Sequence, residues 1–201
     1  PKIGFVYRTT PTSQLYFNAS RAYEAPLNLE LLSSVNANGT PNTGFLNLDA
    51  QRAWQLELGH RGMSADKRYS WDVTVYNLEM QKEILASIIN NQGTFQNANG
   101  TRHTGVEAGG GMVLGKGLFA QGGAGREDSL QTRAAYTWSR FKFTDNVFAG
   151  SGANQVVIAR DGNTVAGAPE HSLNVEARYD HPAGWWIAPN IEWSLSGFYT
   201  D

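Results

Sequence analysis

The feature that most restricts the fold of this chain is a two-residue alternation of apolar and polar side chains. Its clearest instance is residues 171–179, where the odd positions from Leu173 to Tyr179 are apolar and the even positions from Ser172 to Arg178 are polar. Successive side chains of a β-strand point to opposite faces, so this period indicates a strand with one apolar face. A helix does not reproduce that separation, and the chain is therefore predicted to be all-β.

The same reading predicts eight strands, which should pair as an antiparallel up-and-down meander. They cover residues 2–9, 14–23, 54–61, 69–76, 104–114, 130–143, 171–179 and 185–195. Two positions disturb the pattern. Pro189 cannot donate a ladder hydrogen bond, and the sixth strand loses its phase near Arg140, where a bulge or a membrane edge could lie.

The connectors between these strands alternate in length. Those at 10–13, 63–68 and 181–184 are short, whereas those at 24–52, 81–103 and 144–170 are long. The glycine-rich connector at 115–129 is longer than a tight turn and has room for more strand. Outer-membrane β-barrels alternate in this way, with short periplasmic turns and longer extracellular loops.

Composition excludes several classes of protein. A formal net charge of −2 and a pI near 6.1 offer no broad attraction for phosphate backbones, so we do not expect a nucleic-acid partner. Without cysteine there is neither a disulfide framework nor a thiolate zinc site. No run of about 18 apolar residues exists, which excludes a membrane-spanning helix and leaves a barrel as the way to cross a bilayer.

The two faces of the predicted strands suit a membrane barrel. Aromatic residues gather at strand ends on the apolar face, as at a membrane interface: Tyr23, Trp54, Tyr69, Trp71, Tyr179 and Trp185. We expect an outward, convex apolar band of Leu56, Leu58, Val73, Val75, Leu173, Val175, Ile187 and Ile191. Charged groups, among them Glu57, Arg61, Asp72, Glu107, Glu176, Arg178 and Glu192, would line the concave side. The pattern alone also permits a soluble all-β domain with these faces reversed.

Several ordered segments resemble TonB-dependent outer-membrane receptors. Residues 20–26 (SRAYEAP) look like the family's Ser-Arg-aromatic-Glu-x-Pro segment, and residues 48–62 resemble its "L-x-P-Q … E-x-G-x-R-G" strand, with Ala50 at the usual proline. Residues 71–85 are similar to the next strand. Residues 97–107 resemble "N-A-x-x-T-R-H-x-G-x-E", and residues 167–174 resemble "G-x-P-x-H-x-L-N". The likeness covers nearly all of the chain.

The resemblance implies that residues 1–201 are part of the C-terminal half of a barrel of about 22 strands around a plug. The chain opens on Pro1 without a signal peptide and stops at Asp201 within an apparent strand, so we expect an excerpt. The plug domain, the TonB-contacting segment and the final strands are expected to lie outside it. The implied location is the bacterial outer membrane, and the implied partners are a ferric siderophore or similar chelate, the TonB complex and membrane lipid.

The resemblance also implies a function: active import of an iron-siderophore or similar metal chelate, energised through TonB. No cofactor and no enzymatic activity are expected. Two alternatives stay open, a passive porin-like barrel and a small eight-stranded barrel acting as a binding protein or enzyme. A plug domain upstream in the complete reading frame would separate the first reading from both.

No residue is predicted to be catalytic or to bind a metal. Ser20, His60 and Asp72 could suggest a hydrolytic triad, but Ser20 sits in no nucleophile elbow and strand phase puts His60 on the apolar face. The glycines within 109–125 lack the P-loop order and are predicted to form kinks and turns.

Two further pairs are interpreted as structural. The pair Arg102-His103 lies beside a long loop, where contact with an anionic chelate is conceivable, although a hydrogen-bonding role for His103 is favoured. Glu170-His171 is read as the start of a strand. The long loops carry polar and aromatic groups suited to recognition, but none is singled out: Asn28, Glu30, Asn36, Asn38, Phe45, Asn90, Asn91, Phe95, Phe148 and Arg160.

Overall fold

One large antiparallel sheet dominates the computed structural model, which describes residues 1–33, 35–36, 40–89, 91–149 and 156–195. Its strands are β1 (Lys2–Thr10), β2 (Ser13–Glu24), β3 (Gln51–Met63), β4 (Tyr69–Gln81), β7 (Gly100–Gln121), β8 (Glu127–Phe143), β11 (His171–Asp180), β12 (Trp186–Ile187) and β13 (Asn190–Leu195). The helical elements are α1 (Asn28–Leu31) and the 3₁₀ turn η1 (Gly123–Gly125). Within the described residues, no helix is long and apolar enough to cross a membrane.

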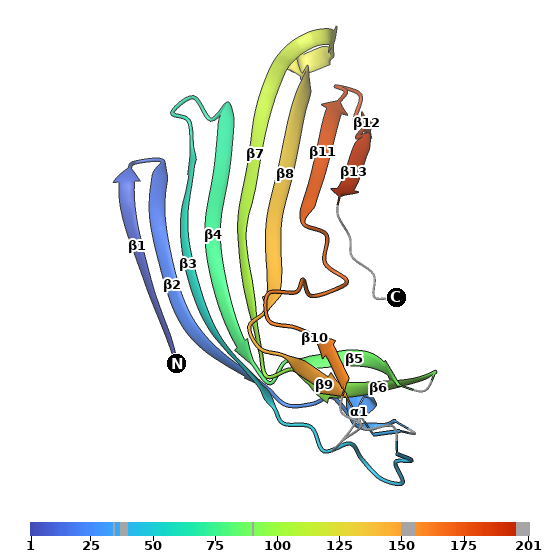
Figure 1. The fold of residues 1–201 in the computed structure, drawn as a ribbon. Coiled ribbons are helices and arrows are strands. Elements are labelled where there is room, and N and C mark those ends of the chain that lie inside the picture. The colour runs from blue at the N-terminus through green and yellow to red at the C-terminus, as the bar shows by residue number, and fades with distance from the viewer. Residues whose placement is uncertain (34, 37–39, 90, 150–155, 196–201) are drawn as a thin grey trace.

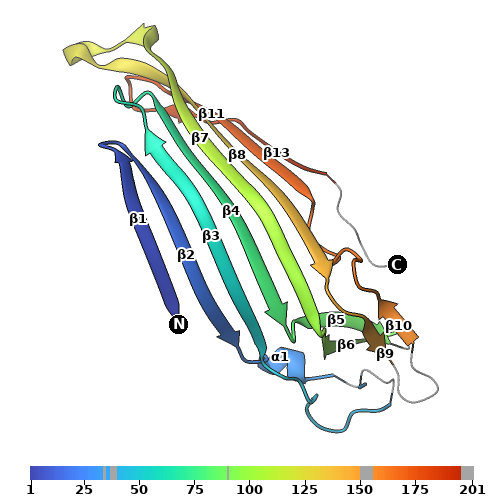
Figure 2. The ribbon, with the colours of Figure 1, turned by 60° about the vertical axis from the view of Figure 1, so that its left-hand side comes forward.

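Strand order follows the chain, from β1 through β2, β3, β4, β7 and β8 to β11, which pairs with both β12 and β13. Every pair is antiparallel, which confirms the predicted meander. The described part of the sheet has an edge at β1 and another at β12 and β13, as expected for a section of a barrel wall. Figures 1 and 2 show the strands running side by side, with the long loops at one end.

The predicted single strand at 185–195 is wrong, because it is divided into β12 and β13. Pro189 stands between the two, where it lacks an N–H for the ladder. The carbonyl oxygen of Pro189 still takes part in the ladder, because it accepts a hydrogen bond from the N–H of Ala177 at 3.1 Å. Trp185 lies outside β12, in the turn that is closed by its carbonyl and the N–H of His181.

The long loops contain two hairpins that the alternation did not predict. Strand β5 (Ile84–Ile89) pairs with β6 (Gln92–Asn97), and β9 (Val147–Ala149) pairs with β10 (Val156–Ala159). The β5 sequence ILASII is apolar almost throughout and shows no two-residue period. These hairpins lie together beyond the end of the main sheet (Figure 1).

The connector at 115–129 forms an extension of the β7–β8 hairpin. Register shifts between Val113 and Gly115 and between Lys116 and Gln121 bend it, and Gly117 has φ +63°. Buried Asp128 accepts the backbone N–H groups of three consecutive residues, Leu118, Phe119 and Ala120. The glycines of this connector therefore serve bulges and turns, as predicted. The prediction does not hold for Gly109, Gly110 and Gly111, which pair in unbroken register with β4 and β8.

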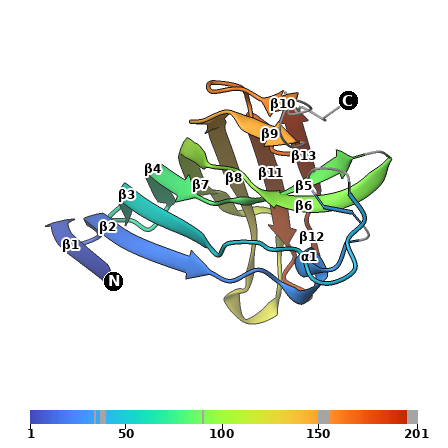
Figure 3. The ribbon, with the colours of Figure 1, turned by 60° about the horizontal axis from the view of Figure 1, so that its bottom comes forward.

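On β3 and β4 the apolar face is more exposed than the polar face, as expected for the wall of a membrane barrel. Leu56, Leu58, Val73 and Val75 are 43–48% exposed, whereas the polar Glu57 is half-buried and Thr74 is buried. Side chains on a concave face converge and shield one another, so the polar face is the concave one of the arc seen in Figure 3. On β11 every residue is half-buried, and there only cross-strand register assigns the face.

Candidate functional site: the concave face and the loop end

Hydrogen bonds between strands organise the concave face. Tyr16 donates its hydroxyl to Asp72 Oδ1 at 3.1 Å and lies 2.5 Å from Thr74 Oγ1. Nearer the loops, Asn18 Nδ2 donates to Glu57 Oε2 at 3.1 Å. The register puts these groups together, since Tyr16 faces Gly59 and Gly59 faces Thr74. The concave surface is therefore an ordered polar wall.

Two glycines make room for tyrosine rings on this wall. A Cβ at Gly59 would overlap the Tyr16 ring, and one at Gly105 would overlap the Tyr76 hydroxyl. Tyr16 faces Gly59 and Tyr76 faces Gly105 across neighbouring strands. An aromatic ring laid over a strand glycine compensates for the packing that the glycine lacks. These pairs keep the rings flat against the wall.

A hollow of about 620 Å³ opens at the short-turn end. Three arginines, Arg8, Arg61 and Arg133, line it together with Asp72, and the glycine stretch 109–111 contributes bare backbone. The Arg61 guanidinium lies 5.4 Å from the centroid of the Tyr16 ring. This end of the concave face can therefore attract anionic groups. The alternation in the sequence placed Arg61 on the polar face but did not single out Arg8 or Arg133. A sequence pattern within one strand does not show which strands are its neighbours in the sheet.

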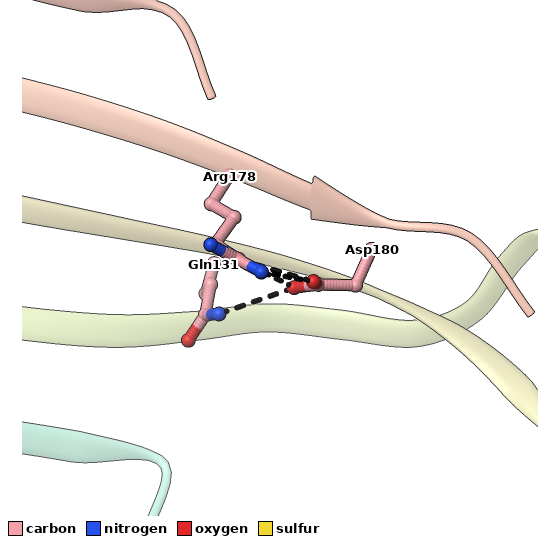
Figure 4. A network of polar contacts seen from close by, with 3 residues as sticks. All are labelled: Gln131, Arg178 and Asp180. Carbon is pink, nitrogen blue, oxygen red and sulfur yellow. Dashed lines mark hydrogen bonds and ion pairs between the residues drawn. The ribbon is translucent and has the colours of Figure 1, made fainter. Parts of the chain in front are cut away.

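A second polar network lies near the same end, on β8 and β11 (Figure 4). Arg178 Nη2 donates to Asp180 Oδ1 at 2.7 Å, and Gln131 Nε2 donates to Asp180 Oδ2 at 3.3 Å. The Arg178 guanidinium also lies 4.5 Å from the Trp186 ring centroid. Arg178 was expected on the polar face, and its position in register with Gln131 agrees with that expectation.

At the other end, the loop hairpins pack around a small apolar cluster. Ala98, Phe143, Val147 and Val165 are buried together, and Leu85 of β5 packs against them. Beside the cluster is a hollow of about 1050 Å³ between the β5–β6 hairpin and residues 158–167. Phe95 of β6 is among its lining residues. The loops thus form a packed cap with an open space in it.

A contact between His103 and Glu83 ties this cap to β7. His103 Nε2 lies 3.3 Å from Glu83 Oε2 without a well-aligned hydrogen bond, and both side chains are under 15% exposed. Burial would raise the pKa of Glu83, but the polar contacts from His103 and Thr101 outweigh it and leave that pKa below its usual value. The His103 ring stacks on Phe141 with centroids 4.1 Å apart. The structural role favoured for His103 is what the geometry supports.

Arg102 and His103 face opposite sides of the sheet, so the two side chains do not contact one chelate together. Neighbouring strand residues face opposite ways, and the register pairs Arg102 with Glu79 and Glu79 with Trp54, on the convex face. Arg102 Nε lies 2.5 Å from Glu79 Oε1. Arg102 therefore points away from the concave wall that carries His103.

The structure also places the other residues that were considered from the sequence. His60 accepts the indole N–H of Trp71 at 3.0 Å on the convex face, whereas Asp72 is on the concave face, so Ser20, His60 and Asp72 form no triad. His171 begins β11, as predicted, and its Nδ1 lies 2.7 Å from the Tyr136 hydroxyl. In the described residues, no group of three or more His, Asp or Glu side chains could hold a metal ion.

The loop residues named from the sequence are spread over the cap. Phe95 lines the larger hollow, whereas Phe45 is 70% exposed and does not line it. Glu30 closes the first turn of α1 through the N–H of Leu27, at 2.7 Å. Asn38 and Asn90 lie outside the described residues.

Comparison with known proteins agrees with this architecture. The family model for the TonB-dependent receptor-like β-barrel matches residues 1–201. No curated protein matches the sequence. Similar solved structures include the copper transporter OprC, with 15% identity, a TM-score of 0.66, and coverage of 97% of this chain and 27% of that one.

Two further structures are similar. The ferric-catecholate import receptor Fiu from E. coli K12 has 20% identity and a TM-score of 0.57, with 89% of this chain and 22% of that chain covered. The alcaligin outer-membrane receptor FauA from Bordetella pertussis has 15% identity and a TM-score of 0.54, with 97% and 29% covered. The chain spans less than a third of each, and likeness at this identity shows the fold. With the family model matching its whole length, the chain belongs to the TonB-dependent receptor-like β-barrel family.

Proposed function

We propose that this chain is part of the barrel of a receptor that imports a ferric siderophore or similar metal chelate, energised through TonB. A plug domain and a TonB-contacting segment encoded outside residues 1–201 belong to the proposal. The observation that carries it is the arrangement of a hollowed loop cap above an ordered, polar concave wall. Such a wall can pass a hydrated, charged solute along its length, whereas its convex face is apolar.

The family and its location support this proposal. TonB-dependent receptors lie in the bacterial outer membrane, and so does this chain. The similar structures are named as a copper transporter, a ferric-catecholate import receptor and an alcaligin receptor, all of which handle metals or their chelators. We infer the same substrate class here and a transport role rather than an enzymatic one.

The two hollows suggest how a chelate would be handled. Recognition is assigned to the cap, because loops on a rigid scaffold carry specificity and the larger hollow is partly apolar and aromatic. The cationic hollow with Arg8, Arg61 and Arg133 would then receive an anionic solute near the short-turn end. Movement between the two is assigned to displacement of the plug by TonB.

Growth on single iron sources tests the function. Deleting the gene for the full-length receptor should abolish growth on one chelate of a panel, and a plasmid copy should restore it only where tonB is intact. Restoration without tonB would contradict energised import and indicate a passive pore. Unchanged growth on every iron or copper chelate would contradict the substrate class.

A pair of loop variants tests the cap. Phe95→Ala should lower chelate uptake at limiting concentration by about tenfold, because aromatic anchors in pockets supply a large share of binding energy. Phe45→Ala removes the same ring from an exposed site outside the hollow and should leave uptake unchanged. Equal effects of the two variants would refute the assignment of recognition to this hollow.

A further inference from the structure

The long loops contain extended stretches of uncharged residues, although charged residues make up 17% of the chain. Aspartate, glutamate, lysine, arginine and histidine are all absent from residues 31–48, 84–101, 146–159 and 162–169. The short turn at 64–68, in contrast, has the sequence SADKR. Charged side chains are ordinarily common on exposed surface. The composition of the long loops therefore indicates a surface suited to an uncharged partner.

The hollow between the β5–β6 hairpin and residues 158–167 has a lining of the same character. Its volume is about 1050 Å³, and each of its described lining residues is aliphatic, aromatic, glycine or a carrier of a hydroxyl or amide group. The hydroxyl and amide groups belong to Ser87, Thr94, Gln96, Asn163 and Thr164. The described part of this wall can thus exchange hydrogen bonds with a ligand but holds no counter-ion for a charged one.

Hydrogen bonds within the protein order the polar groups on both sides of the hollow. Gln96 is 6% exposed and donates from Nε2 to Ser87 Oγ at 3.1 Å. On the other side, Asn163 accepts the backbone N–H of Arg160 through Oδ1 at 2.7 Å. Gln96 can still accept through Oε1, and Asn163 can still donate through Nδ2. These two groups match the amide N–H and carbonyl groups of a neutral ligand.

The charged side chains that border the uncharged stretches lie close to charges of opposite sign. Lys82 Nζ is 3.5 Å from Asp49 Oδ2, and Glu83 Oε2 is 3.3 Å from His103 Nε2. The exposed pair 160–161, which follows the stretch 146–159, is Arg-Asp. Around the hollow, therefore, charge is balanced locally instead of accumulating with one sign.

Lys142 contacts the wall of the hollow from the convex side of the sheet. Its Nζ donates to Thr164 Oγ1 at 2.7 Å. Directly paired residues share a face, and the register pairs Lys142 with Arg102, which lies on the convex face. Lys142 lines a separate, smaller hollow together with Arg140 and Glu170. The larger hollow is thus neutral although a cation stands behind one part of its wall.

We propose that the hollow of the cap selects a ferric chelate without net charge, of the kind formed by three hydroxamate groups. Each hydroxamate carries one negative charge, so three of them neutralise Fe³⁺, whereas three catecholates leave a trianionic complex. Burying charge against a neutral wall is costly, because hydration is lost and no partner replaces it. An uncharged complex avoids that cost and gains from apolar contact with Ile88 and Phe95. This inference rests on the proposed function and narrows its substrate class.

The cationic hollow at the short-turn end is compatible with such a substrate. The donor oxygens of a trihydroxamate complex are individually anionic although the complex is neutral. Arg8, Arg61 and Arg133 can therefore donate hydrogen bonds to them. Selection by net charge is assigned to the cap, where the chelate is first bound.

Equilibrium binding of ferric chelates to the purified full-length receptor tests the proposal in the absence of TonB. Quenching of tryptophan fluorescence would give the Kd of two uncharged trihydroxamates, ferrichrome and coprogen, and of two trianionic complexes, ferric enterobactin and ferric bacillibactin. The tighter trihydroxamate should bind at least roughly tenfold more tightly than either tricatecholate, since a single buried polar group without a partner already has an effect of that size.

The possible results separate this inference from the proposed function. A tricatecholate that binds as tightly as the better trihydroxamate would overturn the inference and leave import of a ferric chelate standing. Failure of all four chelates to bind would contradict the proposed function and this inference with it.

A lysine placed in the hollow should shift the preference toward anions. Ile88 lines the hollow and is 78% exposed, so Ile88→Lys adds a cation without removing a buried side chain. At low ionic strength this variant should bind ferric enterobactin roughly tenfold more tightly than the unmodified receptor, the effect of one charge about 8 Å from a trianion in water. Binding of ferrichrome should not become tighter.

The matched control is Phe45→Lys, which adds the same charge at a 70% exposed site that does not line the hollow. It should leave the Kd of ferric enterobactin nearly unchanged. Heat-modifiable mobility in gels verifies that both variants have folded, and the comparison of chelates on the unmodified receptor does not depend on either. Equal gains in the two variants would overturn the proposal, because the charge of the whole receptor and not that of the hollow would then set the preference.

Discussion

Replacing Val175 with arginine should test directly which face of the sheet meets lipid. The outward positions of β11 run from His171 through Leu173, Val175 and Ala177 to Tyr179, so Val175 is the middle one. Its neighbours in register are Ala134 and Ile191, both apolar. An arginine near the bilayer midplane of such a barrel costs about 2 to 4 kcal/mol. That free energy corresponds to roughly 30-fold to 1000-fold in the folding equilibrium.

Glu176→Gln is the control, one residue further on the opposite face. Glu176 lies in register with Arg133 and Asn190 on the concave wall, where a neutral amide keeps the shape and part of the hydrogen bonding. The assay is reversible guanidinium unfolding of the full-length receptor in lipid vesicles, monitored by tryptophan fluorescence. We expect a large loss for Val175→Arg and almost none for Glu176→Gln. Small, equal losses would refute the lipid-facing assignment.

Two further outcomes follow from the concave wall and the cap. Gly59→Ala should lower the free energy of unfolding by about 1 to 3 kcal/mol, because its Cβ would overlap the Tyr16 ring. Gly93→Ala is the control, since a Cβ at Gly93 would meet open space. Equal denaturation midpoints for the two variants would contradict the contact between the Tyr16 ring and Gly59. Because the folded-state pKa of Glu83 is lowered, its stabilisation of the cap is present at neutral pH and is lost as pH falls below the ordinary value near 4.5. Amide hydrogen exchange in the β5–β6 hairpin should therefore be faster below about pH 4.5 than at neutral pH. Glu83→Gln should remove this dependence of the exchange rate on pH. An unchanged dependence in the variant would show that Glu83 is not the titrating group responsible.

Sequence patterns were sufficient where the structural rule is local. The two-residue period assigned the faces of β3, β4 and β11 because consecutive strand residues must point in opposite directions. It failed at 185–195, where Pro189 interrupts the ladder, and in β5, where apolar residues occupy both faces of a short loop hairpin. It left open whether the break in phase at Arg140 was a bulge or a membrane edge. The unbroken β7–β8 register from Thr101↔Phe143 to Val113↔Gln131 excludes the bulge.

The sequence by itself thus determined that this chain forms an antiparallel wall with one apolar and one polar face, and its ordered motifs indicated the family. Only the tertiary structure decided which side chains meet across that wall. Arg21 and Arg102 are far apart in the chain and share a row because three strand pairings align them. Arg8 and Arg133 likewise meet at one hollow through strands distant in sequence. Alternation is fixed within each strand, but register depends on pairing between strands, and the binding surfaces of a β-barrel are made by register.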